Sequence, residues 1–365
     1  MTELFVPGRL CLLGEHTDWA AGKHRLANSD IPKGYCLVCA TNEGLFGRVE
    51  EFPRENHLRY EHVNAAGLVS SIDVDLGEPD KLLEGARAGG FFAYVYGTVH
   101  HMLPLLRQAL SSLPSPSSAL RGVKICNFKT TLPLKKGLSS SAAVCVLVVK
   151  ALSMHYDLCL DRDAVMACAF EGEILTGTKC GRMDQAVAMG AGRVGLMEFD
   201  GDRCSLHDVP VGAALHFVVC DLKRGKDTGK ILTDLNACFP FPQSDAHRRM
   251  HSYVHDNVAR AAQAVEAIAQ GDAALLAACM LGAQQSFDMC AVDNCPSQLT
   301  APRLHEVMAD AALQAVSLAC KGVGSQGDGS AQVLCAGPDE QAAALARLRA
   351  LGCDAFLLTI PASVP

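Results

Sequence analysis

Residues 7–19 read PGRLCLLGEHTDW. The apolar run before Gly14 indicates a strand, and four polar side chains follow that glycine at once. A strand that ends in Glu15, His16 and Asp18 presents carboxylates and an imidazole together, and these groups hydrogen-bond to the hydroxyls of a polyhydroxylated ligand. The alternative is a surface turn in which Asp18 caps a helix. The segment therefore predicts either a polyol site or an ordinary turn.

A second stretch, residues 132–143, reads LPLKKGLSSSAA and leads into a long helical pattern. A glycine before a serine run at a helix N-terminus places free N–H donors and about half a positive charge where a phosphate can bind. Lys135 and Lys136 would add positive charge, and Ser140 or Ser141 could hold a magnesium ion, which takes oxygen ligands. The alternative is an ordinary serine N-cap without a ligand. The stretch does not follow the Walker A pattern GxxxxGK[ST].

A third stretch, residues 171–185, reads EGEILTGTKCGRMDQ. It places Glu171 and Glu173 on a helix before a glycine-containing loop that leads to Asp184. One of these carboxylates could bind magnesium while another orients an attacking hydroxyl, because phosphoryl transfer needs positioning and charge neutralisation more than covalent chemistry. Taken singly, each acid is more often a solvated surface charge.

A fourth stretch, residues 322–331, reads GVGSQGDGSA and precedes an apolar strand pattern. Glycines allow close approach of the backbone and unusual dihedral angles, which suits the lining of a phosphate or substrate cavity. A tight loop between a helix and a strand explains the same residues equally well.

The composition is that of a folded globular chain, with 365 residues, 49% of them apolar and 19% charged. A net charge of −7 gives no electrostatic reason to expect a nucleic-acid or anionic membrane partner. The apolar run at residues 141–149 is well short of the roughly 20 residues that a bilayer requires, and the N-terminus lacks a signal pattern. The 17 cysteines form no disulfide-like pattern, and we expect a cytoplasmic protein.

Apolar periodicity predicts a mixture of strands and helices without regular βαβ alternation, which indicates an α+β protein. A length of 365 residues favours two domains. The expected strands are 4–13, 34–41, 122–131, 214–222 and 332–335, and the expected helices are 95–110, 139–155, 162–176, 251–270, 272–287, 301–319 and 340–351.

In this order and spacing the four stretches resemble the GHMP kinase superfamily. Residues 8–18 look like its galactokinase signature, residues 180–185 its catalytic loop, residues 138–142 its phosphate loop and residues 322–331 its C-terminal glycine motif. The resemblance implies the two-domain GHMP architecture, with the active site in the interdomain cleft. The N-terminal domain would span 1–205 and carry the ATP, sugar and catalytic residues, and a ferredoxin-like C-terminal domain would span 206–365.

Carried over position by position, the resemblance gives Asp184 the role of receiving or orienting the proton of the substrate hydroxyl. Arg9 would lie beside it and stabilise the transferring charge. Glu15, His16 and Asp18, together with Asp184, would bind the sugar.

The resemblance also implies ATP and Mg²⁺ as cofactors. Magnesium would be held by Ser140 or Ser141 with Glu173, for which Glu171 is the weaker substitute. The ATP phosphates would lie on a loop of Lys135, Lys136, Gly137, Leu138, Ser139, Ser140, Ser141 and Ala142, and the glycine motif would be Gly324, Gly327 and Gly329.

The sequence departs from the galactokinase pattern in three places. Residues 20–25 read AAGKHR where an Asn-Gly-Gly or similar is usual, lysines stand at positions 135 and 136 where glycine and a small residue are usual, and residues 227–235 contain no tyrosine. Galactose itself is therefore not implied. The basic residues Lys23, His24 and Arg25 raise the hypothesis of an anionic substrate such as a uronic acid, since arginine recognises carboxylates well.

The function predicted in this way is an ATP-dependent sugar kinase that acts on the anomeric 1-OH of a small-molecule sugar. One alternative is a GHMP kinase for a non-sugar alcohol, against which the cluster of Glu15, His16 and Asp18 argues. Another is a catalytically silent sugar sensor, which the lysines at 135 and 136 favour and Asp184 opposes. The sequence does not indicate an oligomeric state.

Overall fold

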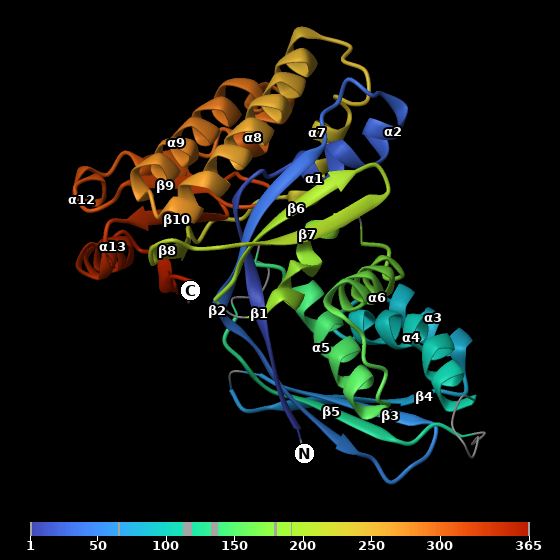
Figure 1. The fold of residues 1–365 in the computed structure, drawn as a ribbon. Helices are drawn as coiled ribbons and strands as arrows, with labels where there is room; N and C mark the ends of the chain where they lie inside the picture. Colours follow the sequence, from blue (N-terminus) through green and yellow to red (C-terminus); the bar gives the residue numbers. More distant parts are fainter. Residues whose placement is uncertain are drawn as a thin grey trace. The chain divides into compact units, whose positions relative to one another are not determined.

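The computed structural model describes residues 2–64, 66–111, 119–132, 138–178, 181–190 and 192–363. The chain packs into two compact units. Unit 1 contains Met1–Arg9 and Thr41–Ala191, and unit 2 contains Leu10–Ala40 and Gly192–Pro365. Both units are drawn in Figure 1.

Unit 1 is a sheet covered on one face by helices. Its strands lie in the order β4-β3-β5-β2, in which β3 runs parallel to β5 and the other pairs are antiparallel. Figure 1 shows α3 to α6 over one face of β3, β4 and β5. The elements are β1 (Thr2–Leu13), β2 (Gly34–Glu51), β3 (His57–Val63), β4 (Val69–Asp75), α3 (Pro79–Arg87), α4 (Ala93–Ser111), β5 (Val123–Thr130), α5 (Ser140–His155), α6 (Arg162–Ile174) and the 3₁₀ helix η2 (Arg182–Met189).

The central helix of unit 1 is α5. Its residues from Ala142 to Val149 are all apolar, and their side chains are all buried. A helix that is hydrophobic on every side is stable only inside a core. The N-terminus of α5, which carries the serine run, is therefore held in place by the packing of the whole helix.

Unit 2 is built on a second, antiparallel sheet in the order β11-β8-β10-β9. The long helices α8 and α9 pack against each other, and α9 also packs on β9. The first half of β2 pairs with β6, and β6 pairs with β7. The elements are the helical turns α1 (Thr17–Trp19), η1 (Ala20–His24) and α2 (Arg25–Ala27), then β6 (Val194–Asp200), β7 (Arg203–Val209), β8 (Leu215–Asp221), α7 (Thr228–Asn236), α8 (Asp245–Gln270), α9 (Ala273–Cys290), η3 (Val292–Asn294), α10 (Pro296–Leu299), α11 (Pro302–Met308), α12 (Ala311–Gln314), β9 (Ala319–Gly322), β10 (Ser330–Cys335), α13 (Pro338–Ala350) and β11 (Asp354–Ile360).

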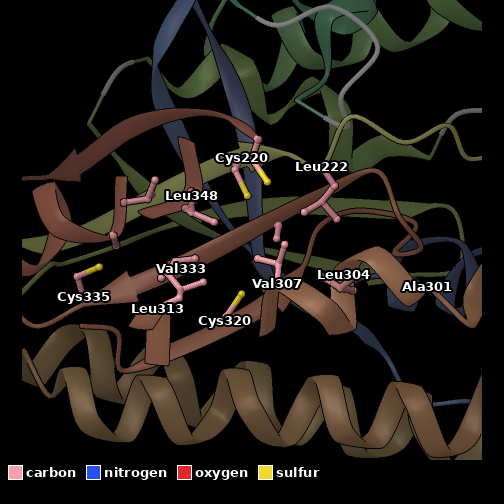
Figure 2. Close-up of a cluster of buried hydrophobic side chains, with 14 residues drawn as sticks. Cys220, Leu222, Ala301, Leu304, Val307, Leu313, Cys320, Val333, Cys335 and Leu348 are labelled. Atoms are coloured by element: carbon pink, nitrogen blue, oxygen red, sulfur yellow. The ribbon is translucent and has the colours of Figure 1, made fainter. Parts of the chain in front are cut away.

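One face of the second sheet carries a hydrophobic core, shown in Figure 2. Val218 and Cys220 of β8 and Val333 of β10 meet Leu304 and Val307 of α11 in this cluster. Because side chains alternate along a strand, the residues between them point to the opposite face. Lys321 of β9 lies next to Cys320, which belongs to the core cluster, and the alternation therefore directs the lysine away from that core.

Most of the predicted elements are present, but the single helix expected at residues 301–319 is wrong. The structure has two short helices there, α11 and α12, followed by β9. Asp310 interrupts the helix because its backbone is extended (ψ 114°) and its Oδ1 accepts from the N–H of Leu313 at 2.8 Å. A side chain that satisfies a free N–H in this way begins a new helix.

The predicted division at residues 205 and 206 remains a prediction. The packing groups residues 10–40 with the C-terminal part of the chain. In this segment Ala20 and Ile31 belong to the same buried cluster as Tyr253 and Phe287 of α8 and α9. Contacts of this kind join residues more than 200 positions apart, and a boundary drawn along the sequence does not represent them.

One helix among the described residues, Ala273–Asn294, is long and apolar enough to cross a membrane by length and composition alone. Half of the most apolar stretch of this helix is buried inside the structure. Packing against α8 and β9 accounts for this apolar character.

Replacing Gly14 by alanine should destabilise the protein by at least about 3 kcal/mol. Gly14 has a φ of 94°, and a Cβ atom there would overlap the carbonyl oxygen of Tyr35 and lie 2.8 Å from the Cα of Cys36. Gly89→Ala is the matched control, since Gly89 also has a positive φ of 77° but no atom within 4 Å of an added Cβ. Chemical denaturation of both variants tests the prediction, and equal losses would contradict it.

Candidate active site

Asp184 is the centre of a charged cluster in unit 1. It lies in the first turn of η2. Nη2 of Arg9, a buried residue of β1, donates to Oδ1 of Asp184. The hydroxyl of Ser139 donates to the same oxygen at 2.9 Å. Two donors thus hold this carboxylate. It still reaches solvent, because 28% of the Asp184 side chain is exposed.

Ser139 does not act as an ordinary helix cap. It occupies the N-cap position of α5 in a left-handed conformation (φ 60°, ψ 42°) and makes no side-chain cap hydrogen bond. Its hydroxyl is bound to Asp184 instead. The alternative of a plain serine N-cap is therefore wrong. The first N–H groups of α5 have no cap from Ser139, which leaves the donors that favour an anion at a helix N-terminus.

The remaining residues of the expected phosphate loop are only partly described. Lys135, Lys136 and Gly137 lie outside the described residues. Leu138 is buried, and its carbonyl accepts from the backbone N–H of Arg9 at 3.2 Å, which ties the loop to β1. The other members of the loop belong to α5: Ser140 and Ser141 are half-buried, and Ala142 is fully buried.

Glu173 lies on α6 and is fully buried. Its Oε2 accepts from Nε2 of Gln185 at 2.7 Å, and its Oε1 is buried without a hydrogen-bond partner among the described residues. Burial raises the pKa of Glu173 to about 7, and the negative charge of Asp184 adds to the increase, while the nearby Ser141 hydroxyl and Gln185 oppose it. Glu171 is half-exposed. Its negative charge acts on His101, where it opposes the lowering of the histidine pKa by burial.

These residues fit a magnesium ion. A buried carboxylate oxygen without a partner and a serine hydroxyl beside it are hard oxygen donors of the kind that Mg²⁺ takes, usually together with water and phosphate oxygens. The described residues contain no group of three or more His, Cys, Asp or Glu side chains that could hold a metal by themselves. A magnesium ion at Glu173 and Ser141 would therefore depend on ligands from a bound nucleotide.

Glu15 lies in unit 2 and forms a buried ion pair that the sequence did not reveal. Nζ of Lys321 donates to Oε1 of Glu15, and both side chains are almost completely buried. The carbonyl of Glu15 accepts from Oη of Tyr253 at 3.2 Å and from Nδ2 of Asn257 at 3.0 Å. The turn after Gly14 is thus held through both the side chain and the backbone of Glu15.

His16 is buried and neutral. Its ring stacks on Phe287 with centroids 5.5 Å apart, and its Nδ1 accepts from Nε1 of Trp19 at 3.2 Å. Burial lowers the pKa of His16 to about 3, and the charges of Lys226 and Lys321 contribute. Because Nδ1 accepts, Nε2 carries the proton, and this buried N–H has no hydrogen-bond partner among the described residues.

Asp18 does not cap a helix, so the alternative of a capped surface turn is wrong. His16 holds the N-cap position of α1, and no side-chain cap bond is made there. Asp18 lies within the first turn of α1 and is 9% exposed. The turn is held instead by Thr17, whose hydroxyl donates to the carbonyl of Gly14 at 2.8 Å.

The glycine motif connects β9 and β10, which are neighbouring antiparallel strands. The loop therefore joins two strands, and the alternative of a helix-to-strand loop is wrong. Gly324 and Gly327 have positive φ angles of 63° and 72°. A Cβ atom at Gly329 would lie within 2.7 to 3.0 Å of the Lys226 side chain, so this glycine leaves room for the lysine.

Lys226 is a second charged residue that the sequence did not single out. Its Nζ donates to the carbonyl oxygens of Gln326 at 2.8 Å and Val323 at 3.4 Å, both in the glycine motif. The residue as a whole is half-buried, and its ammonium group contacts these two carbonyl oxygens. Burial lowers the pKa of Lys226 to about 8, and the charge of Glu15 opposes this decrease.

The basic residues that suggested an anionic substrate are mostly engaged by the chain itself. Nε of Arg25 pairs with Oδ1 of Asp200 at 2.8 Å, and Nε2 of His24 forms a hydrogen bond with Oδ1 of Asn236 at 2.9 Å. Lys23 is exposed. Arg25 and His24 therefore give no support to that hypothesis.

Part of the chain matches a known family model and known proteins. Residues 93–192 match the model of the GHMP kinases N terminal domain. Galactokinase from Actinobacillus succinogenes is 27% identical over 186 residues, which is 51% of this chain and 40% of that protein. Galactokinase from Thermotoga maritima is 27% identical over 184 residues, 50% of this chain and 42% of that protein. The matched part thus spans about two fifths of the length of these curated relatives.

Solved structures share the fold along the whole chain. Lactococcus lactis galactokinase complexed with galactose superposes with a TM-score of 0.71 at 17% identity and covers 99% of this chain and 94% of its own. Methanococcus jannaschii mevalonate kinase gives a TM-score of 0.71 at 15% identity and covers 99% and 98%. The predicted α+β GHMP kinase fold is confirmed, while a location of the active site in an interdomain cleft remains a prediction. The predicted resemblance to the GHMP kinase superfamily is thus confirmed by the match of residues 93–192 to its N-terminal domain and by the galactokinase relatives.

Proposed function

We propose that this protein is an ATP- and Mg²⁺-dependent kinase that transfers the γ-phosphoryl group to a sugar hydroxyl, the anomeric 1-OH by analogy with its galactokinase relatives. The observation that supports this proposal best is the pair of contacts at Asp184. One carboxylate is held by Arg9 and by Ser139, and Ser139 begins the helix whose N-terminus suits a phosphate.

The chemistry assigned to this cluster is proton acceptance and charge stabilisation. Asp184 accepts the proton of the sugar hydroxyl while the oxygen of that hydroxyl bonds to the γ-phosphorus. The bond from the γ-phosphorus to the ADP oxygen breaks in the same step. Arg9 stabilises the negative charge on Asp184 and on the phosphoryl group in transfer. The uncapped N–H groups of α5 hold phosphate oxygens. Glu173 and Ser141 would hold magnesium, which neutralises phosphate charge when it is bound.

Recognition of the sugar is assigned in this proposal to Glu15, His16 and Asp18. His16 offers a buried N–H at Nε2 that suits a ligand oxygen. Asp18 retains a small exposed area. Glu15 forms an ion pair with Lys321, and this pair reduces the capacity of the Glu15 carboxylate to accept a hydrogen bond from a sugar hydroxyl.

Release of ADP from Mg-ATP across a panel of neutral sugars and uronic acids tests the proposal. Asp184→Ala should lower turnover by about 10²- to 10⁴-fold, the usual contribution of a positioned general base. Asp163→Ala is the matched control, because Asp163 lies on α6 with a side chain that is 71% exposed. Turnover of Asp184→Ala within tenfold of the parent would contradict the role of Asp184, and sugar binding without any turnover would favour a catalytically silent sugar sensor.

A further inference from the structure

A chain of buried hydrogen bonds connects α9 to the turn that carries Glu15. Oε1 of Gln284, a residue of α9, accepts from the backbone N–H of Gly322 at 2.8 Å. The carbonyl of Gly322 accepts from Nζ of Lys321 at 3.0 Å, and the same ammonium group donates to Oε1 of Glu15. The three side chains in this connection are each at most 2% exposed. All four residues belong to unit 2.

The position of β9 in its sheet explains why Gly322 depends on side chains. β9 is an edge strand, because it stands last in the order β11-β8-β10-β9 and pairs with β10. One side of an edge strand has backbone N–H and C=O groups that no neighbouring strand satisfies, and such a group is costly when it is buried. At Gly322, Gln284 accepts from the N–H and Lys321 donates to the carbonyl. The end of β9 is therefore held by these two side chains.

The orientation of the Gln284 amide is fixed at both of its ends. Because the backbone N–H of Gly322 can only donate, the amide oxygen must face Gly322. The amide nitrogen, Nε2, donates to Oδ1 of Asp288 at 2.9 Å, one turn further along α9. Nε2 of His305, on α11, lies 3.7 Å from the same carboxylate oxygen. Turning the amide over would break both hydrogen bonds, so Gln284 holds Gly322 in one defined position.

We propose that Gln284 is a positioning residue of the sugar site. It holds the backbone of Gly322, and Gly322 and the Lys321 ammonium together fix the direction of the Glu15 carboxylate. The inference rests on the proposed sugar kinase function, in which Glu15 takes part in recognition of the sugar. The residues proposed to hold ATP belong to unit 1. Loss of Gln284 should therefore weaken the binding of the sugar and leave the binding of ATP unchanged.

The variant Gln284→Met tests this role, because it removes both hydrogen bonds and keeps most of the side-chain volume. Release of ADP from Mg-ATP is measured at increasing concentrations of the sugar that the parent protein turns over best. The KM for this sugar should rise about 10- to 100-fold, since a displacement of about 1 Å can have an effect of this size. The KM for ATP should not change, and kcat should change far less than the sugar KM, because binding and not the chemical step is weakened.

The matched control is Gln341→Met. Gln341 is also buried, with 3% exposed, and its Nε2 donates to the carbonyl oxygens of Phe217 at 2.7 Å and Leu358 at 3.2 Å. These bonds hold α13 on β8 and β11. Both variants should lower the denaturation midpoint, whereas only Gln284→Met should raise the sugar KM. An equal rise in the sugar KM of both variants would show a general effect of lost stability and would overturn the inference.

A second measurement shows whether Gln284 acts through Lys321. Gln284→Met is combined with Lys321→Met, and the sugar KM of the double variant is compared with those of the two single variants. If the hydrogen bonds form one path, Gln284→Met should raise the sugar KM far less in this background than in the parent protein. Two effects that multiply independently would overturn the path through Lys321.

The outcomes separate this inference from the proposed function. Sugar turnover with the same KM in the parent and in Gln284→Met would overturn the positioning role and leave the kinase intact. Calorimetric titration with galactose, glucose and their uronic acids measures binding without turnover. Binding that weakens in Gln284→Met, with no ADP release from any sugar, would support the positioning role and overturn the kinase. A parent protein that neither binds nor phosphorylates any of these sugars would overturn both.

Discussion

Replacing Lys321 by methionine should destabilise the protein by about 3 to 5 kcal/mol, because it removes the ammonium group that pairs with the buried Glu15 carboxylate. Glu15 is 1% exposed, and Nζ of Lys321 donates both to its Oε1 and to the carbonyl of Gly322. Methionine keeps most of the volume of lysine and removes its charge. Guanidinium denaturation of the ligand-free protein at pH 7 measures the loss.

Two further variants show whether charge causes that loss. The double variant Lys321→Met with Glu15→Gln removes both charges, and we expect it to recover at least half of the lost stability. Lys230→Met breaks the exposed pair with Asp234 and should cost less than about 1 kcal/mol. A double variant as unstable as Lys321→Met would show that packing, and not the loss of the ion pair with Glu15, is responsible.

Glu173→Gln should make the protein more stable at pH 8 by about 3 kcal/mol and leave its stability nearly unchanged at pH 4.5. Burial raises the pKa of Glu173 from its ordinary value of 4.5 to about 7 in the folded state. Between pH 4.5 and about pH 7, Glu173 keeps its proton in the folded protein and releases it in the unfolded chain. The stability that this proton gives is complete below about pH 4.5 and is lost as the pH rises through 7. Glutamine has no proton to lose, and its amide oxygen can still accept from Gln185.

Denaturation midpoints of the parent and Glu173→Gln from pH 4.5 to 8, without nucleotide or magnesium, measure this difference. A difference in stability that does not change with pH would contradict the buried, proton-binding role of Glu173. The same substitution should lower Mg²⁺-dependent turnover under the proposed function, since it replaces the carboxylate oxygens that would hold the ion. A gain in stability together with a loss of activity is typical of a functional site that is kept at a cost to folding.

Local sequence patterns predicted much of the fold. The apolar run of α5 and the long helices α8 and α9 follow from periodicity within a few turns of chain. The expected helix at 301–319 failed for a local reason that periodicity does not represent, the capping side chain of Asp310. The loop at 322–329 was recognised as glycine-rich, but its place between two antiparallel strands depends on pairing with the rest of the sheet.

The sequence by itself determined the family resemblance, the α+β class and the residue types at Asp184, Arg9 and Glu173, because each belongs to a short, ordered motif. Only the tertiary structure decided their partners. Ser139 meets Asp184 across 45 positions, and Lys321 meets Glu15 across 306. A lysine in an apolar strand carries no sign of the carboxylate that will neutralise it, because burial and pairing come from packing and not from neighbours along the chain.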